Sequence, residues 1–291
     1  MEQKDLVSNV TFQTLLNIGG HGNRRNDILF SAPVSADIIG QQDSSLPDRH
    51  VVFFPGDIQN FHKEMQRHTA SQRWSQWSYE NTSALLHRRF PNSYVWLVKP
   101  SRTHDATFSC YDNFLPGNIF GAPTDCGNFD GLSHLRKLLS GAMQDVNGQS
   151  TRFQVPAISK HSPLILVGFS KGCVVLNQIV HELDMARSDP ALMEFLGAIG
   201  ALYWLDAGHS LASGVWITDP EILQRLSGLG VSIHVHVTPR QVRDPGRPLM
   251  GQEERLFVDL LKELKAEVYE TLHFPDEPRS LDQHFCILDN F

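Results

Sequence analysis

A serine between two glycines has the spacing of a catalytic nucleophile. The segment GFSKG places Ser170 between Gly168 and Gly172, which matches the G-x-S-x-G pattern of a nucleophile elbow. In such an elbow a sharp turn from a strand into a helix lifts the serine hydroxyl above the edge of a sheet. Glycines suit the flanking positions because strand and helix approach each other too closely there for larger side chains. The pattern predicts that Ser170 attacks the carbonyl carbon of an ester or thioester.

The residues on both sides of the pattern favour the same interpretation. Residues 164–167 are all apolar, as expected of a buried strand, and apolar residues recur at helical spacing after the serine, at Val174, Val175, Ile179, Val180 and Leu183. A chance match to the five-residue pattern would rarely lie between two such segments. The alternative is an ordinary strand-to-helix connection in which Ser170 caps the helix.

A histidine base is the next requirement, because a serine hydroxyl is a poor nucleophile on its own. In α/β-hydrolases the catalytic residues follow along the chain in the order serine, acid, histidine. His284 fits this order because we expect it in a loop after the last strand, which is predicted at residues 268–274. His273 lies inside that strand and is the second candidate.

Two aspartates are candidates for the carboxylate that orients the histidine. Asp244 comes after the strand predicted at residues 231–237, where this fold most often has its acid, and is slightly favoured although a loop separates it from the strand. Asp206 directly follows the strand predicted at residues 198–205. The aspartate outside the triad would be an ordinary turn or capping residue.

Backbone amides are expected to bind the oxyanion that forms on the substrate. In α/β-hydrolases one N–H comes from the loop after the third strand and another from the residue after the nucleophile. The strand predicted at residues 50–54 runs into such a loop, so the candidates are the amides of Asp57 and Ile58, together with that of Lys171. The plainer interpretation of this loop is a tight turn into a polar helix near Asn60.

Predicted strands and helices alternate at least five times, without an internal repeat or a linker. We therefore expect one domain over residues 1–291 with the α/β-hydrolase fold, in which helices cover both faces of a mostly parallel sheet. A long excursion at residues 101–131 is too apolar for disorder, since it contains Phe108, Tyr111, Phe114, Phe120 and Phe129. It could wall a pocket or simply pack over the edge of the sheet.

The composition, with 41% hydrophobic and 20% charged residues, is typical of a soluble globular protein. No apolar run approaches the ~18 residues of a membrane span. The net charge of −7 argues against a nucleic-acid partner held by phosphate contacts. Four cysteines without a C-x-x-C pair indicate a reduced intracellular compartment and neither a zinc knuckle nor a redox motif. Because no G-x-G-x-x-G follows the first strand, we expect no nucleotide cofactor.

Two further groups of residues have ordinary and functional interpretations. His234 and His236 alternate on one strand and could bind a metal, but no third ligand has a suitable spacing, so no metal is predicted. Arg240, Arg243 and Arg247 lie near Asp244 and could bind an anionic substrate by bidentate contacts. A solvated loop is the plainer interpretation of these arginines.

Five segments together resemble the chromosome 2 open reading frame 69 family of eukaryotic hydrolase-like proteins: VVFFPGDIQNF, TFSCYDNF, LVGFSKGCVVLNQ, LDAGHS and HVTPRQVRDPGRP. The resemblance extends from about His50 to Phe285. It implies an α/β-hydrolase fold similar to esterases and lipases, a serine nucleophile at Ser170 and a mitochondrial location. The first residues are unlike an import peptide, because Glu2 and Asp5 are acidic and no arginine precedes Arg24. A cytosolic location is the alternative if no import peptide is missing.

Two functional hypotheses follow. In the first, the chain is a serine hydrolase that uses Ser170, His284 and one of the two aspartates to cleave an acyl ester or thioester through an acyl-enzyme. In the second, it is a catalytically silent hydrolase-fold scaffold that binds a protein partner or a small ligand, because a fold does not determine a function.

Overall fold

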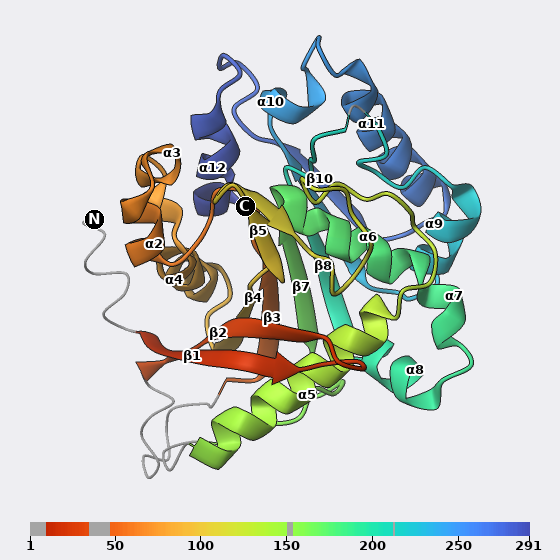
Figure 1. Ribbon diagram of the computed structural model, residues 1–291. Coiled ribbons are helices and arrows are strands. Elements are labelled where there is room, and N and C mark those ends of the chain that lie inside the picture. Colours follow the sequence, from red (N-terminus) through yellow and green to blue (C-terminus); the bar gives the residue numbers. More distant parts are fainter. Residues whose placement is uncertain (1–9, 35–46, 150–153, 212) are drawn as a thin grey trace.

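A central sheet of eight strands organises the computed structural model, which describes residues 10–34, 47–149, 154–211 and 213–291 (Figure 1). Glu2, Asp5 and the segment between residues 35 and 46 lie outside these ranges. The strands follow one another in the order β1-β2-β4-β3-β7-β8-β9-β10. Their bounds are Val10–Gly19 for β1, Arg25–Pro33 for β2, Arg49–Phe54 for β3, Ser93–Val98 for β4, Leu164–Phe169 for β7, Ile199–Leu205 for β8, Ser232–Val237 for β9 and Val268–Leu272 for β10.

Most of the sheet is parallel. Every neighbouring pair from β4 to β10 is parallel, whereas β1 and β2 run antiparallel at one edge. Strands β4 and β7 are buried at every residue, which explains why their sequences are continuous apolar runs instead of alternating patterns. The predicted α/β-hydrolase architecture with a mostly parallel sheet is confirmed.

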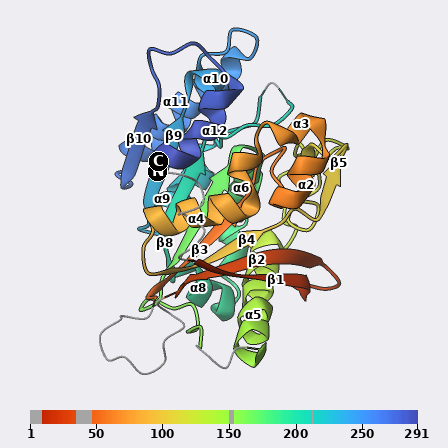
Figure 2. The ribbon, with the colours of Figure 1, turned by 90° about the vertical axis from the view of Figure 1, so that its left-hand side faces the viewer.

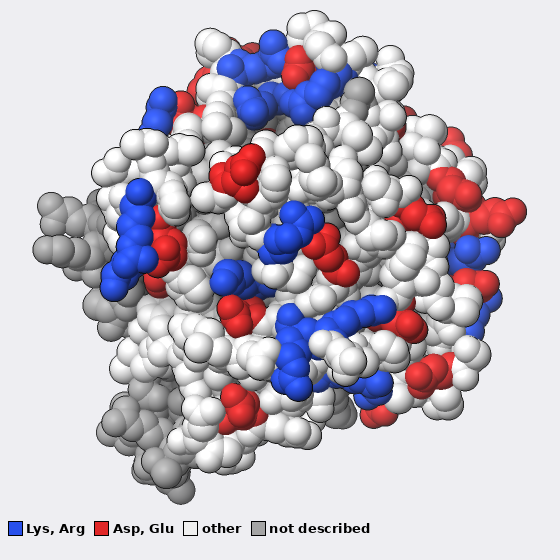
Figure 3. Space-filling model, viewed as in Figure 1, with Lys and Arg blue, Asp and Glu red and all other residues white. Residues whose placement is uncertain are grey.

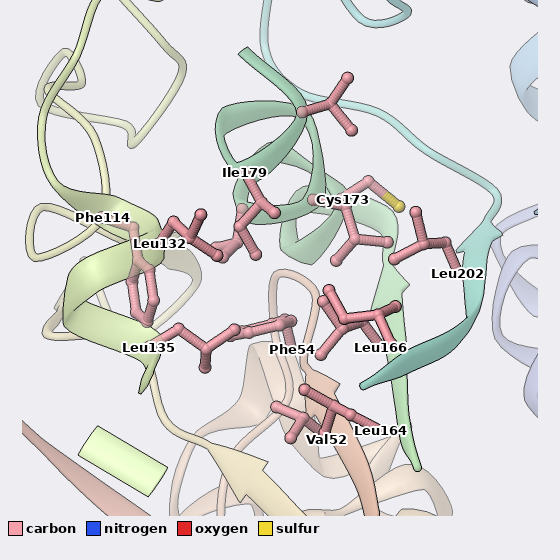
Figure 4. Close-up of a cluster of buried hydrophobic side chains, with 14 of the residues drawn as sticks. Val52, Phe54, Phe114, Leu132, Leu135, Leu164, Leu166, Cys173, Ile179 and Leu202 are labelled. Atoms are coloured by element: carbon pink, nitrogen blue, oxygen red, sulfur yellow. The ribbon is translucent and has the colours of Figure 1, made fainter. Parts of the chain in front are cut away.

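Alternate side chains of each central strand enter two separate cores, one on each face of the sheet. Val52 and Phe54 of β3 belong to one core, and Val51 and Phe53 belong to the other. Figure 4 shows Phe54 and Leu166 of the first core packed toward helices α5 and α6. Figure 2 shows the antiparallel hairpin of β1 and β2 beside α5.

Helices cover both faces, as predicted. The first core lies under α5 (Gly131–Gln149), α6 (Cys173–His181), α7 (Leu183–Ala186), α8 (Pro190–Leu196), α9 (Pro220–Ser227) and α11 (Pro248–Glu263). The second core lies under α2 (His62–Arg67), α4 (Tyr79–Arg89) and α12 (Leu281–Asn290). Two short helices, α3 (Thr69–Gln72) and α10 (Pro239–Val242), lie in connections. No helix in the described ranges is long and apolar enough to cross a membrane.

The excursion at residues 101–131 is folded. It begins with the two-stranded hairpin of β5 (Arg102–His104) and β6 (Phe108–Cys110). Tyr111 and Phe114 are buried, and their rings meet the ring of Phe54 edge-on at centroid distances of 6.1 and 5.6 Å. The excursion is thus anchored in the main core by its aromatic residues, which leaves the hairpin free to border the carboxyl ends of the strands.

The segment around His284 differs from the prediction. It is the first turn of helix α12 and not a loop. The side chain of Ser280 caps this helix, since its Oγ accepts a hydrogen bond of 3.1 Å from the backbone N–H of Gln283. Serine followed three residues later by glutamine is a signature of a helix start, and this signal would have identified the helix from the sequence.

Candidate active site

The carboxyl ends of four neighbouring strands bring the candidate residues together. Asp57 follows β3, Ser170 follows β7, Asp206 follows β8 and Thr238 follows β9, and these strands are adjacent in the sheet. Because parallel strands end at the same edge, residues far apart in the chain meet there. Helix α12 adds His284 to this edge, where its ring lies 4.7 Å from the ring of Phe169 between centroids.

A cavity of about 220 Å³ opens at this edge of the sheet. Ser170, His284 and Asp57 line it together with Phe108 of the β5–β6 hairpin and Arg240 of α10. The excursion at residues 101–131 therefore walls a pocket, which was one of its two predicted roles.

Ser170 occupies a strained turn between β7 and α6. Its φ is +51°, in the left-handed region that is costly for a residue with a side chain. Among the described residues its side chain makes no capping hydrogen bond, because the N-cap of the 3-10 turn at residues 170–172 is Phe169 and the N-cap of α6 is Gly172. The interpretation of Ser170 as a helix cap is therefore wrong. Strain of this kind persists only where the surrounding structure holds it, and it is common at functional sites.

Gly172 is required by the close approach of the elbow to β3. A Cβ atom added at this position would overlap the carbonyl oxygen of Phe54. We expect Gly172→Ala to lower the free energy of unfolding by at least about 1–3 kcal/mol, because the backbone on both sides would have to move apart. Urea unfolding measures this change. Gly148→Ala is the matched control, since an added Cβ there meets nothing within 4 Å on helix α5, and unchanged or higher stability is expected for it. Equal stability of the two variants would contradict the prediction.

His284 and Asp206 form a buried hydrogen bond. His284 Nδ1 lies 2.6 Å from Asp206 Oδ2, and the two residues are 5% and 0% exposed. The Asp206 carboxylate also accepts hydrogen bonds of 2.7 Å from both the backbone N–H and the hydroxyl of Thr238. Since a carboxylate only accepts, Nδ1 of His284 must be the donor. Nε2 of the neutral ring is then free to accept a proton, as the base of a triad requires.

Asp244, the slightly favoured acid, lies elsewhere. Its carboxylate binds Arg247 at 3.1 Å, Arg279 at 2.8 Å and the backbone N–H of Gly246 at 2.9 Å. These contacts, led by the Gly246 N–H, hold the pKa of Asp244 below its ordinary value. The preference for Asp244 as the partner of His284 is wrong, because the carboxylate of Asp206 is the one bonded to His284 Nδ1, while that of Asp244 is held by Arg247 and Arg279.

The other histidines considered from the sequence are engaged in a separate cluster. His273 Nε2 lies 2.9 Å from His236 Nδ1, and the ring of His234 stacks on Tyr203 with 4.0 Å between centroids. Burial, followed by the nearby His273 and His234, lowers the pKa of His236 to about 3. In the described part of the chain, no group of three or more His, Cys, Asp or Glu side chains is arranged to hold a metal ion.

Two of the three predicted oxyanion amides remain available. The backbone N–H of Ile58 is occupied, because it donates a hydrogen bond of 2.7 Å to the carbonyl oxygen of Thr107, so the prediction for Ile58 is wrong. The N–H groups of Asp57 and Lys171 have no acceptor within the described ranges. These two amides belong to the loop after β3 and to the residue after the serine, as the fold requires.

An ion pair between a buried lysine and a partly exposed aspartate joins the side chains of the same two residues, and sequence reasoning missed it. Lys171 Nζ lies 3.0 Å from Asp57 Oδ2, with the lysine side chain 0% exposed. Nζ also donates a hydrogen bond of 2.6 Å to the carbonyl of Phe120, and Asp57 Oδ1 accepts one of 2.8 Å from the backbone of Ser109. Burial raises the pKa of Asp57, while the charge of Lys171 acts in the opposite direction. The ion pair and its two hydrogen bonds connect the loop after β3, the elbow and the excursion. They therefore help to fix the distance between the backbone amides of Asp57 and Lys171.

The described structure contains no hydrogen bond between Ser170 Oγ and His284 Nε2, although both side chains line the same cavity. In structures without substrate, such bonds are often long and shorten only when the substrate binds. The cavity is therefore lined by a serine and by a histidine whose Nδ1 is bonded to a buried carboxylate, and the unbonded amides of Asp57 and Lys171 lie in the loop after β3 and directly after the serine.

The sheet, the elbow and the order of Ser170, Asp206 and His284 define an α/β-hydrolase-fold protein. Solved structures agree with this class. The esterase Est22 superimposes with a TM-score of 0.51 at 12% identity, covering 98% of this chain and 78% of that one. A ferulic acid esterase superimposes with a TM-score of 0.52 at 10% identity, covering 96% and 94%. Likeness at this level of identity concerns the fold alone.

Sequence comparison identifies the family within this class. A family model described as C2orf69 matches residues 14–162 and 147–267. The mitochondrial protein C2orf69 homolog of Danio rerio is 44% identical over 282 residues, which cover 92% of this chain and 82% of that protein. The mitochondrial protein C2orf69 of Homo sapiens is 37% identical, with 95% and 81% covered. The chain belongs to the C2orf69 family, as its resemblance implied.

Proposed function

We propose that this chain is a serine hydrolase that cleaves a small acyl ester or thioester. The observation that carries the proposal is the buried hydrogen bond of 2.6 Å between His284 Nδ1 and Asp206 Oδ2, formed at the cavity that Ser170 also lines. A cavity of about 220 Å³ favours a short acyl group, since pockets for larger ligands measure roughly 300–1,000 Å³. We also propose that the whole chain acts as one hydrolase-like domain.

In the proposed reaction Ser170 Oγ attacks the carbonyl carbon of the substrate while His284 Nε2 takes the hydroxyl proton. The amides of Asp57 and Lys171 bind the oxyanion. His284 then gives its proton to the leaving alcohol or thiol, and the acyl group remains on Ser170. Water then attacks the acyl carbon while His284 takes a proton from it. The bond between this carbon and Ser170 Oγ breaks, His284 returns the proton to Oγ, and the carboxylic acid is released. Asp206 keeps the ring oriented and stabilises its charged form throughout.

A catalytically silent scaffold is the second candidate. The observation in its favour is the absence of a hydrogen bond between Ser170 Oγ and His284 Nε2 within the described ranges. A scaffold would keep the cavity for a ligand or a partner without activating the serine.

A fluorophosphonate probe separates the two candidates. An activated serine displaces fluoride from phosphorus, forms a bond from Oγ to phosphorus and passes its proton to the histidine. We expect one probe per native chain, mapped to Ser170 by mass spectrometry, and none on Ser170→Ala. His284→Ala should lose at least about 100-fold in labelling rate, which is the scale of general base catalysis. His273→Ala, the matched control, should label at the native rate because His273 is bound to His236. Native protein that stays unlabelled, or equal rates for the two histidine variants, would favour the scaffold.

We propose a mitochondrial location as well, because the Danio rerio and Homo sapiens relatives are named mitochondrial proteins. Fractionation of cells that make the endogenous protein tests this, and recovery in the cytosol alone would contradict it.

A further inference from the structure

Arginines gather at one side of the cavity in a chain whose net charge is −7. Arg240 and Arg247 line the cavity, Arg279 binds Asp244 together with Arg247, and Arg243 is the neighbour of Asp244 in the chain. Figure 3 shows such basic side chains at the top of the molecule, over α10 and the start of α11, with an acidic side chain among them. Asp206 and Asp244, the two carboxylates that act on Arg240, do not balance four guanidinium groups, so this side of the cavity is positive.

Three of the four arginines have partners. Arg247 and Arg279 bind Asp244 at 3.1 and 2.8 Å, and Arg243 donates a hydrogen bond of 2.7 Å to the carbonyl oxygen of Pro275. Arg240 makes no hydrogen bond or ion pair with any residue that the structure describes. Its side chain is nevertheless partly buried, and the burial, followed by the charge of Arg247, lowers its pKa. A partly buried guanidinium group that lines a cavity and has no acceptor of its own among the described residues is a feature that a ligand would satisfy.

The nearby carboxylates, Asp57 in the cavity wall and Asp206 behind His284, are not that acceptor. Asp57 is bound to Lys171, and Asp206 is bound to His284 and Thr238. Arg240 lies in the first turn of α10, two residues after Thr238, and so reaches the cavity from the side of the histidine and its aspartate. The apolar wall at Ile58 and Phe108 comes from other segments of the chain. The cavity therefore combines a serine, an apolar wall and one unpaired cation.

We propose that Arg240 binds an anionic group, a carboxylate or a phosphate, on the part of the substrate that does not react. The substrates of this site are then acidic esters or thioesters, an inference that rests on the proposed hydrolase function. A guanidinium group suits this role because it can donate two parallel hydrogen bonds to one carboxylate or phosphate. Arg247 adds positive charge beside it while remaining paired with Asp244.

Titration with free anions tests the binding without requiring catalysis. Sodium succinate and sodium phosphate are titrated separately into the native chain, Arg240→Gln, Arg240→Lys and Arg243→Gln, at constant ionic strength. We expect one of the two anions to bind the native chain, and the anion that binds more tightly identifies the group as carboxylate or phosphate.

Arg240→Gln should bind this anion about 10- to 100-fold more weakly, the scale of a lost charged hydrogen-bonding pair, and the affinity of Arg240→Lys should lie between those of Arg240→Gln and the native chain. Arg243→Gln, the matched control outside the cavity lining, should bind like the native chain. Absence of binding by both anions, or equal binding by Arg240→Gln, would overturn the inference.

Hydrolysis provides the second measurement. The ratio of kcat/KM for mono-p-nitrophenyl succinate to that for p-nitrophenyl pentanoate, each corrected for uncatalysed hydrolysis, should fall about 10- to 100-fold in Arg240→Gln and stay constant in Arg243→Gln. The two proposals fail separately. If the chain binds an anion through Arg240 but is not labelled by fluorophosphonate, only the proposed hydrolase function is refuted. If the chain is labelled at Ser170 but binds neither anion, only the proposed role of Arg240 is refuted.

Discussion

Replacing Asp206 with asparagine is expected to lower kcat for ester hydrolysis by about three to four orders of magnitude. The carboxylate of Asp206 accepts from His284 Nδ1 and from both donors of Thr238. An asparagine would keep one oxygen for Thr238 and turn its NH₂ group toward the ring. Nδ1 would then have to accept, so the ring proton would move to Nε2, and Nε2 could no longer take the proton of Ser170.

Asp244→Asn is the matched control for this prediction. It removes the same charge from a partly exposed ion pair with Arg247 and Arg279, for which a loss of at most about 1 kcal/mol of stability and little change in kcat are expected. Circular dichroism shows whether each variant is folded, and steady-state hydrolysis of p-nitrophenyl acetate gives kcat. If Asp244→Asn lost activity while folded Asp206→Asn kept it, the assignment of the acid would be wrong.

Lowering the pH from 7 to 5 is expected to remove a large part of the stability of the folded chain. Burial is the first cause that lowers the pKa of His50 and His134 to about 4 and that of His236 to about 3, from an ordinary value of 6.5. These histidines stay neutral in the folded chain at pH 5, while the unfolded chain binds a proton at each. Since the unfolded state binds more protons below pH 6.5, stability falls as the pH falls. The three together should cost on the order of 6 kcal/mol at pH 5, out of roughly 5–15 kcal/mol for a typical domain.

Urea unfolding at pH 7, 6 and 5 measures this loss. His236→Gln removes one of the titrating groups. Below pH 6, the free energy of unfolding of this variant should therefore change with pH by about 1.4 kcal/mol per pH unit less than that of the native chain. His161→Gln is the matched control, because His161 is exposed and its side chain has no partner in the described residues, and its pH dependence should equal that of the native chain. Identical slopes for His236→Gln and the native chain would contradict this account.

Much of the fold and the nucleophile could be predicted from the sequence. The elbow is a local structure, because the strand, the glycines and the helix around Ser170 are consecutive and their pattern is contained in one short segment. Strands β3, β7 and β8 were predicted for a similar reason, since buried parallel strands are continuous apolar runs. His284 was found through its place in the chain order, although its helix was missed because the capping signal at Ser280 was not used.

The partners of these residues were decided only by the tertiary structure. The order of the strands in the sheet places the end of β8 next to the elbow, and this selects Asp206 over Asp244 as the partner of His284. The fold of the excursion, which is distant in sequence, occupies the amide of Ile58 and surrounds the ion pair of Lys171 and Asp57. Arg240 differs from Arg243 and Arg247 because those two have partners, whereas Arg240 has none in the part of the chain that the structure describes. Local patterns determine which element a residue belongs to, whereas hydrogen bonds and ion pairs between distant segments depend on how those elements pack.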